Sequence, residues 1–247
     1  MKLLRLFGIV VVLAGLVGLP VPPVQAADFT MTLAPGQKVT VPLDLWCLNY
    51  GKPFPTSIEG PTPRAEDALV QVVQTALKKG AVSTEIYQTQ LAIWRVTTGA
   101  YQDFAGKGTA LAEEIFNEAQ SATIAAPPPD AVLVEEAVAA GTLKVAIEDF
   151  VALPAPGIPG TPFHGQADLV IENVSTQSVK FVLLEGAVFT PTSDNAQALI
   201  SHQNPLDPPV LPETGGGWAM QGFTAVMAVA AGLLLLLAGT ALRRTAR

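Results

Sequence analysis

Cysteine and histidine are scarce in this sequence. It has one cysteine, Cys47, and two histidines, His164 and His202, in 247 residues. A single cysteine excludes an intrachain disulfide, and these three residues do not have the spacing of a metal site. No phosphate-binding loop, no dinucleotide-binding glycine pattern and no Ser/His/Asp order is present either. The sequence therefore predicts no metal, no cofactor and no enzyme activity.

Charged residues are also few, at 14% of the chain, whereas hydrophobic residues make up 49%. This apolar content is enough for a core and excludes a disordered or low-complexity chain. All acidic residues lie between Asp28 and Glu213, where nine basic residues against 21 acidic ones leave a formal charge of −12. An acidic body of this kind argues against binding to nucleic acid and against adsorption on anionic lipid.

Long apolar runs lie only at the two ends of the chain. Residues 3–19 follow a basic start and precede small residues up to Ala26, which is typical of a secretory signal peptide over residues 1–26. Residues 222–242 carry no charge and are long enough to cross a hydrocarbon core of about 30 Å. The arginines in 243–247 favour a cytoplasmic tail. We therefore expect an exported protein with an extracellular body and a C-terminal transmembrane helix.

The first half of the body predicts strands packed against helices. Alternating apolar residues over 29–48 predict β structure and place Cys47 on the apolar face near the end of its strand. Apolar stripes at helical spacing predict helices over 65–79, 84–96 and 109–122, with Ser83 as the N-cap of the second. The proline-rich residues 51–63 predict a loop. Residues 27–125 are thus expected to form one domain.

The second half is expected to be rich in β structure. Residues 126–141 predict a linker and a short helix that begins after Asp130, and residues 142–200 predict strands. These strands are expected at 143–153, in a hairpin of 168–174 with 178–184, and at 187–189. They extend the first sheet or form a separate β module. Residues 201–217 predict an extended Pro/Gly-rich stem. The expected fold class is α+β, followed by the transmembrane helix.

The five residues that end this stem form a motif. They read Leu211-Pro212-Glu213-Thr214-Gly215 and are followed by the apolar run and then by the arginines. This order resembles the cell-wall sorting signal of Gram-positive surface proteins, which has an LPxTG pentapeptide, an apolar span and a basic tail. Pro212 suits an extended segment that an enzyme groove can read.

The resemblance to a sorting signal implies two partners. In that family a membrane transpeptidase, sortase, cleaves between the threonine and the glycine of the motif and joins the threonine to an amine of the cell-wall peptidoglycan. Carried over, the cleavage falls between Thr214 and Gly215, and the chain is the substrate rather than the catalyst. If the motif stands there by chance, the transmembrane helix alone holds the protein.

Gln90 is a polar residue in an apolar setting. Four residues share its face at helical spacing, namely Ile86, Tyr87, Ile93 and Trp94. A side-chain amide at the centre of such a face costs about 1–3 kcal/mol unless its hydrogen bonds are met. We therefore expect Gln90 to have a buried partner.

The segment around Gln90 carries a second resemblance. Thr89-Gln90-Leu91-Ala92-Ile93-Trp94 is similar to the TQxA-x-W motif of thioester domains in Gram-positive surface adhesins, and Trp46-Cys47-Leu48 is similar to their aromatic-Cys-apolar motif. The resemblance implies a thioester between the Cys47 thiol and the Gln90 side chain, formed with loss of ammonia and opened by an amine of a target. The motif residues around that bond are Trp46, Thr89, Ala92 and Trp94.

Both residues also have an ordinary interpretation. A lone cysteine is often an inert part of a core, and backbone groups can satisfy a buried glutamine. The sequence therefore supports two functions. The first is a wall-attached adhesin that bonds covalently to amines on a target. The alternative is a structural or ligand-binding envelope protein without covalent chemistry, held by its transmembrane anchor.

Overall fold

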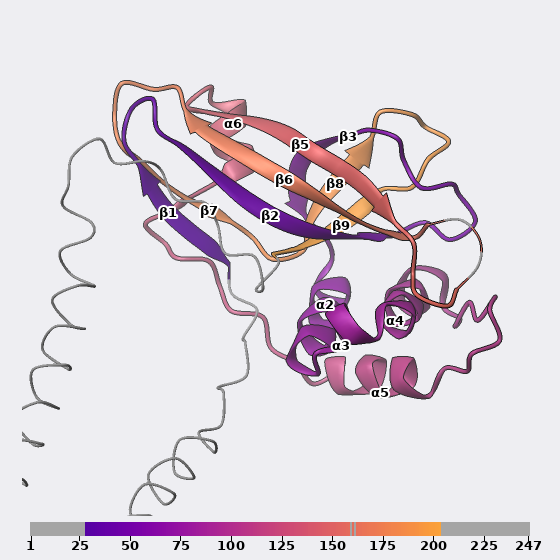
Figure 1. Cartoon of the computed structure of the whole chain (residues 1–247). Helices are drawn as coiled ribbons and strands as arrows, with labels where there is room; N and C mark the ends of the chain where they lie inside the picture. Colours follow the sequence, from indigo (N-terminus) through magenta and orange to yellow (C-terminus); the bar gives the residue numbers. More distant parts are fainter. Residues whose placement is uncertain (1–27, 159, 161, 204–247) are drawn as a thin grey trace, which may run out of the picture. The chain divides into compact units, whose positions relative to one another are not determined.

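The computed structural model describes residues 28–158, 160 and 162–203 (Figure 1). These residues form a mixed α+β body that is rich in strands, so the expected α+β class is confirmed. The predicted signal peptide, the LPETG motif, the apolar span and the basic tail lie outside the described residues. Within the part that the structure describes, no helix is both long and apolar enough to cross a membrane.

The larger sheet has six strands in the order β3-β8-β9-β2-β6-β5, and all neighbours are antiparallel. Its central strand β2 (Lys38–Cys47) pairs with β6 (His164–Asn173) and with β9 (Leu199–Gln203). The outer strands are β5 (Leu143–Leu153), β8 (Ala187–Pro191) and β3 (Ile58–Arg64). Strands from the second half of the body therefore extend the sheet of the first half, which is one of the two arrangements left open by the sequence.

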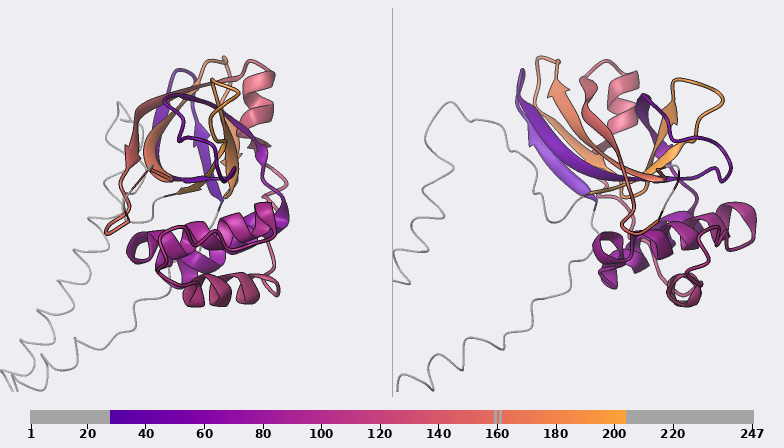
Figure 2. Two further views of the ribbon diagram at one scale, coloured as in Figure 1. Left: turned by 90° about the vertical axis from the view of Figure 1, so that its right-hand side faces the viewer. Right: turned by 45° about the vertical axis from the view of Figure 1, so that its right-hand side comes forward.

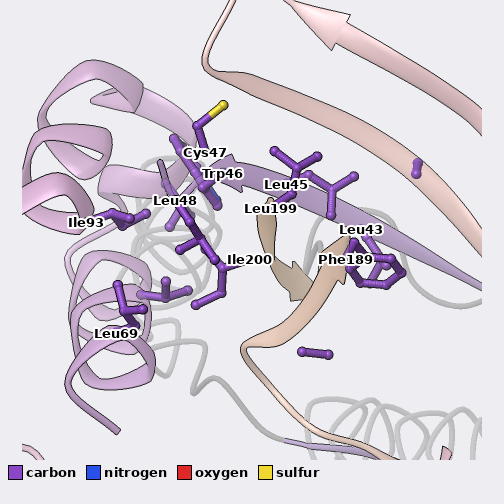
Figure 3. Close-up of a cluster of buried hydrophobic side chains, with 14 of the residues drawn as sticks. Leu43, Leu45, Trp46, Cys47, Leu48, Leu69, Ile93, Phe189, Leu199 and Ile200 are labelled. Carbon is purple, nitrogen blue, oxygen red and sulfur yellow. The ribbon is translucent and has the colours of Figure 1, made fainter. Parts of the chain in front are cut away.

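The predicted alternation along β2 is confirmed. Its inward-facing residues are each at most 2% exposed, namely Val39, Val41, Leu43, Leu45 and Cys47. Trp46 faces the other way and is also fully buried, because helices cover that face at the end of the strand. Figure 3 shows Leu48, Ile93 and Leu69 gathered on the helical side, while the sulfur of Cys47 points away from them.

A second, smaller sheet consists of β1 (Phe29–Leu33), β7 (Val179–Leu183) and β4 (Val132–Leu133), with β7 in the middle. The expected hairpin of 168–174 with 178–184 is wrong, because β6 and β7 lie in different sheets. The side chain of Asn173 accounts for this: its amide nitrogen donates to the carbonyls of Leu33 and Gln177. These bonds hold the turn against the end of β1, so that β7 pairs with β1 instead of β6.

Four helices pack together beyond one end of the larger sheet (Figures 1 and 2). They are α2 (Asp67–Lys78), α3 (Ala81–Thr84), α4 (Ile86–Thr98) and α5 (Ala110–Ala119). The three predicted helices are confirmed as α2, α4 and α5, with their ends shifted by a few residues. The expected N-cap at Ser83 is wrong, because Ser83 lies inside α3 and Glu85 occupies the N-cap of α4.

Two more local predictions are wrong. The expected loop over 51–63 contains the start of β3 at Ile58, and the prolines of this strand are tolerated because it lies at the edge of the sheet. Asp130 does not begin a helix. Strand β4 follows it, α6 (Val134–Ala139) begins only after Leu133, and the Asp130 carboxylate pairs with Lys180. The strands expected at 143–153 and 187–189 are confirmed as β5 and β8, whereas β9 is not predicted.

Candidate functional site

Cys47 is the last residue of β2, at the end of the sheet that faces the helices. Its side chain is fully buried, and its backbone N–H donates to the carbonyl of Phe163 at 3.0 Å. Burial raises the pKa of the Cys47 thiol far above its ordinary value, because the charged thiolate has no water around it. A free thiol here is therefore protonated at neutral pH and shielded from reagents in solution.

Gln90 lies beside Cys47, as the sequence predicted. Its side-chain oxygen accepts a hydrogen bond from the Cys47 N–H at 3.1 Å, and its amide nitrogen donates to the Cys47 carbonyl at 2.7 Å. The Cys47 N–H is therefore shared between the Gln90 side-chain oxygen and the carbonyl of Phe163, which precedes β6. The buried amide is thus satisfied by backbone groups, one of the two interpretations left open above.

The other residues of the segments that resemble a thioester motif are buried in the same region. Thr89 and Ala92 are fully buried on α4, and Trp94 follows Gln90 by one helical turn with 3% of its surface exposed. The ring of Trp46 packs against His164 at a centroid distance of 4.4 Å. Trp46, Thr89 and Ala92 are therefore part of the packing between helix and sheet. Trp94 also lines a cavity.

A cavity of about 500 Å³ lies against this end of the sheet. Its walls include four aromatic side chains, Tyr50, Trp94, Phe104 and Phe163, together with Gln197. A larger cavity, of about 600 Å³, is lined by residues of α2, by the end of α5 and by residues 121–126 instead. Cys47 does not line the aromatic cavity, but two lining residues lie near it: the Phe163 carbonyl accepts from the Cys47 N–H, and Tyr50 follows Cys47 by three residues.

Gln197 is a buried glutamine that the sequence analysis missed. It is 3% exposed, its N–H donates to the carbonyl of Pro53, and its side-chain nitrogen donates to the carbonyl of Lys52 at 2.5 Å. Its side-chain oxygen is buried and has no hydrogen-bond partner in the part of the chain that the structure describes. Burying such an acceptor without a partner costs stability.

The strand register brings Gln197 close to Cys47. Cys47 is paired with Leu199 across β2 and β9, and the next ladder bond runs from the Leu48 N–H to the Ala198 carbonyl at 2.9 Å. Gln197 precedes Ala198 by one residue and lies just outside β9, so it is near this end of β2. The signal in the sequence is a glutamine just before a short apolar run, Ala198-Leu199-Ile200.

A hydrogen-bonded turn fixes the loop that carries Phe104. The Tyr87 hydroxyl donates to Asp103 Oδ1 at 2.8 Å and accepts from the Ala105 N–H, while Asp103 accepts from the N–H groups of Lys107 and Gly108. Burial and then the hydrogen bond to Asp103 raise the pKa of Tyr87 to about 12. The phenol therefore stays protonated and holds the wall of the cavity in place.

A second polar cluster lies on the opposite face of the sheet. His202 Nδ1 is 2.7 Å from Glu185 Oε1, and both side chains are 1% exposed. Burial alone lowers the pKa of His202, but the Glu185 carboxylate outweighs it, so the net pKa of His202 is raised. Asp44, opposite His202 in the ladder, accepts from Gln166 at 2.9 Å. Asp44 is three residues before Cys47 on β2, and His202 is three residues after Leu199 on β9. Because side chains alternate between the two faces of a sheet, Asp44 and His202 face away from the thiol.

Two searches complete the description of the site, one for a metal site among the described residues and one for relatives among known proteins. Within residues 28–158, 160 and 162–203, no group of three or more His, Cys, Asp and Glu side chains is placed to hold a metal ion. No protein-family model, no curated protein and no solved structure matches this chain.

Proposed function

We propose that this chain is an exported surface protein whose body carries an internal thioester at Cys47, able to bond to amines on a target. The observation that carries the proposal is the environment of Cys47: a fully buried lone thiol whose backbone is bound on both its N–H and its carbonyl by the buried side chain of Gln90. A buried, free thiol in this position does not serve as a metal ligand or as half of a disulfide. Shielding from water is what an acyl group held in reserve requires.

The chemistry needs no further reactant. The Cys47 sulfur attacks the side-chain carbonyl carbon of a glutamine, the bond from that carbon to nitrogen breaks, and ammonia leaves with the thiol proton. A target amine later attacks the same carbon, the bond to sulfur breaks, and the sulfur takes up the proton that the amine gives up. The products are an amide on the glutamine side chain and a free Cys47 thiol.

Gln90 and Gln197 are both candidates for the acyl donor, and their contacts favour Gln197. Both polar atoms of the Gln90 side chain are bound to the Cys47 backbone, which gives Gln90 a positioning role at the end of β2. Gln197 uses its nitrogen only, in a bond to Lys52, and its oxygen is unpartnered among the described residues. Losing the side-chain nitrogen as ammonia costs one hydrogen bond at either residue, so the distinction rests on the unpartnered oxygen of Gln197.

The place of the protein in the cell is the part of the proposal that rests on sequence. The signal peptide, the LPETG motif, the apolar span and the basic tail support export, followed by attachment to peptidoglycan by a sortase. Without a matching sortase, the C-terminal span would hold the protein in the membrane with its body outside. No feature of the chain supports binding to nucleic acid.

A second candidate is a non-covalent structural or ligand-binding envelope protein. The observation that favours it is the pair of hydrogen bonds between Gln90 and the Cys47 backbone, because they satisfy the buried amide without any covalent bond. In that case the aromatic cavity beside Cys47 is the working site, and the thiol is a small residue of the core.

Methylamine separates these candidates and identifies the donor. The full chain, purified without reducing agent, is incubated with methylamine, digested and mapped by mass spectrometry. A thioester places one methylamide on the donor glutamine, and we expect it on Gln197. A methylamide on Gln90 would assign the donor predicted from sequence. Absence of label on both, with Cys47→Ala as the blank, would reject the thioester and leave the non-covalent candidate.

A further inference from the structure

The two outer strands of the larger sheet differ in how well they could pair with a further strand. Strand β3 contains Pro61 and Pro63, which have no N–H to donate. Strand β5 runs over 11 residues without proline or glycine and lies at the other border of the sheet (Figure 1). Within the part of the chain that the structure describes, no strand pairs with its outer side. β5 is therefore the edge that is open to another strand.

The hydrogen bonds at the start of β5 show which of its backbone groups face the open edge. The Thr142 carbonyl accepts from the Val174 N–H at 3.1 Å, directly before the ladder between β5 and β6. In an antiparallel pair this direction alternates from one residue to the next, so Ala146 also bonds toward β6. Val145 and Ile147 therefore direct their N–H and C=O groups to the open edge.

Two exposed charges on this edge lack an ion pair. Lys144 and Glu148 are both exposed, and neither forms an ion pair with another residue that the structure describes. Lys144 stands opposite Glu172, which already pairs with Lys38 at 3.1 Å. Glu148 stands opposite Asp168, a residue of like charge. The edge thus presents a cation and an anion four residues apart, and each of them could be stabilised by an opposite charge from outside.

A second copy of this chain supplies both opposite charges. When two β5 strands pair antiparallel about a two-fold axis at Ala146, residues equally far from Ala146 on either side stand opposite each other. Lys144 of each copy then faces Glu148 of the other copy on the outer face. On the inner face the half-buried Val145 and Ile147 cover each other, and their outward backbone groups form the new ladder.

Two exposed valines lie at the ends of the same segment. Val151 is 46% exposed and Val174 is 50% exposed. The bulge between Glu148 and Val151 adds one residue to β5, so that Val151 keeps the face of Glu148. In the symmetric pair Val151 stands opposite Thr142 of the second copy, whose neighbour on β6 is Val174. Each end of the new ladder therefore gathers two exposed apolar side chains into one patch.

We infer that β5 is an interface between two copies of this chain, which pair edge to edge about a two-fold axis at Ala146. A lysine on an edge strand commonly prevents such pairing, but here Glu148 of the second copy stands at the position that receives it. Because both copies use the same edge, the assembly closes at two copies. The inference uses neither Cys47 nor the two glutamines, so it is independent of the proposed function.

Disulfide trapping tests the register, because it captures a pair held by only a short ladder. Ala146 faces its own copy as a non-hydrogen-bonded pair, in which the Cα atoms lie about 4.5 Å apart, within the reach of a disulfide. The full chain with Ala146→Cys, in detergent solution, is oxidised with copper phenanthroline and followed on a non-reducing gel. Wild type is the blank, since its Cys47 is fully buried.

Ala152→Cys is the matched control for chance collisions. Ala152 is exposed on the same strand but lies away from the two-fold axis. We expect Ala146→Cys to form the linked dimer roughly tenfold faster than Ala152→Cys, because only Ala146 meets its own copy. Equal rates for the two variants, or no linked dimer with Ala146→Cys, would overturn the inference.

Charge exchange in the Ala146→Cys background tests the partner residues. Glu148→Lys faces Asp168 in its own chain, which favours the fold, but faces Lys144 of the second copy, so we expect linking to slow roughly tenfold. Lys144→Glu should slow it as well. A mixture of the two variants restores both ion pairs, and fast linking should return. Linking unaffected by Glu148→Lys, or a mixture no faster than either variant alone, would contradict the proposed pairing.

Discussion

The two buried glutamines on either side of Cys47 are bound in different ways. Gln90, on the helical side, uses its oxygen and its nitrogen to hold the backbone of Cys47. Gln197, which lines the aromatic cavity, uses only its nitrogen, and its buried oxygen has no partner among the described residues. Both are at least 97% buried, so the difference does not come from access to water.

The difference separates a structural amide from one that is available for chemistry or binding. A satisfied buried amide adds specificity to the fold, because any shift of α4 along the sheet would break both bonds at once. A half-satisfied one costs stability, and such costs are found mainly at functional sites. We therefore propose a structural role for Gln90, the donor that the sequence predicts, and a functional role for Gln197, and the predictions below test that proposal.

The largest expected effect concerns the reactivity of the thiol. In denaturant at mildly acidic pH, a maleimide should not label Cys47 in the untreated chain, because its sulfur is held in the thioester. After methylamine treatment the same reagent should label the full amount of Cys47. Labelling is measured by intact mass. An ordinary buried thiol would contradict the proposal by reacting fully in denaturant without any amine.

The next largest effect is on stability. Gln90→Ala leaves the Cys47 carbonyl without its side-chain partner and opens a small cavity, so the free energy of unfolding should fall by about 2–4 kcal/mol. Urea unfolding measures this. The matched control is Gln88→Ala on the same helix: Gln88 also makes two hydrogen bonds to backbone but is half-buried, and we expect a loss of about 1 kcal/mol. Equal losses of unfolding free energy in the two variants would contradict the structural role given to Gln90.

Gln197→Ala should show the reverse pattern. It removes one hydrogen bond together with a costly unpartnered oxygen, so the free energy of unfolding should change by at most about 1 kcal/mol. The methylamine label, however, should disappear. A strongly destabilised Gln197→Ala variant that keeps its label would reverse the roles given to the two glutamines.

The smallest expected effect is a pH dependence from the second polar cluster. Because Glu185 raises the pKa of His202 in the folded protein, its contribution to stability is fully present below the unfolded value and is lost as pH rises through the folded pKa. The free energy of unfolding should therefore fall with rising pH above about 6.5. His202→Gln should flatten this slope, whereas the maleimide labelling pattern of Cys47 should not change. A slope that survives in His202→Gln would assign the effect to another group.

The elements that the sequence predicts well are those whose signal is local. The alternation of 38–47 and the stripes of α2, α4 and α5 depend on neighbours within a turn or a few residues. The hairpin fails because the choice of partner for β7 depends on Leu33, far earlier in the chain, through the side chain of Asn173. Strand β9 is missed because it is short and ends in the polar residues Ser201, His202 and Gln203.

The candidate site shows the same contrast between features set by neighbours in the sequence and features set by distant residues. The position of Gln90 on an apolar helix face and the parity of Cys47 are local, and they correctly bring the two residues together. The place of Gln197 follows from the pairing of β9 with β2, which joins residues more than 150 positions apart. The cavity likewise depends on rings from four separate segments, so no periodicity in the sequence indicates it.

The most direct test of the central claim is the intact mass of the freshly purified, untreated chain, measured without reducing agent. An internal thioester lowers the mass by one ammonia relative to the sequence, and Cys47→Ala restores the full value. Gln197→Ala should restore it as well, while Gln90→Ala, where it folds, should keep part of the deficit. A full calculated mass in the wild-type chain would contradict the claim.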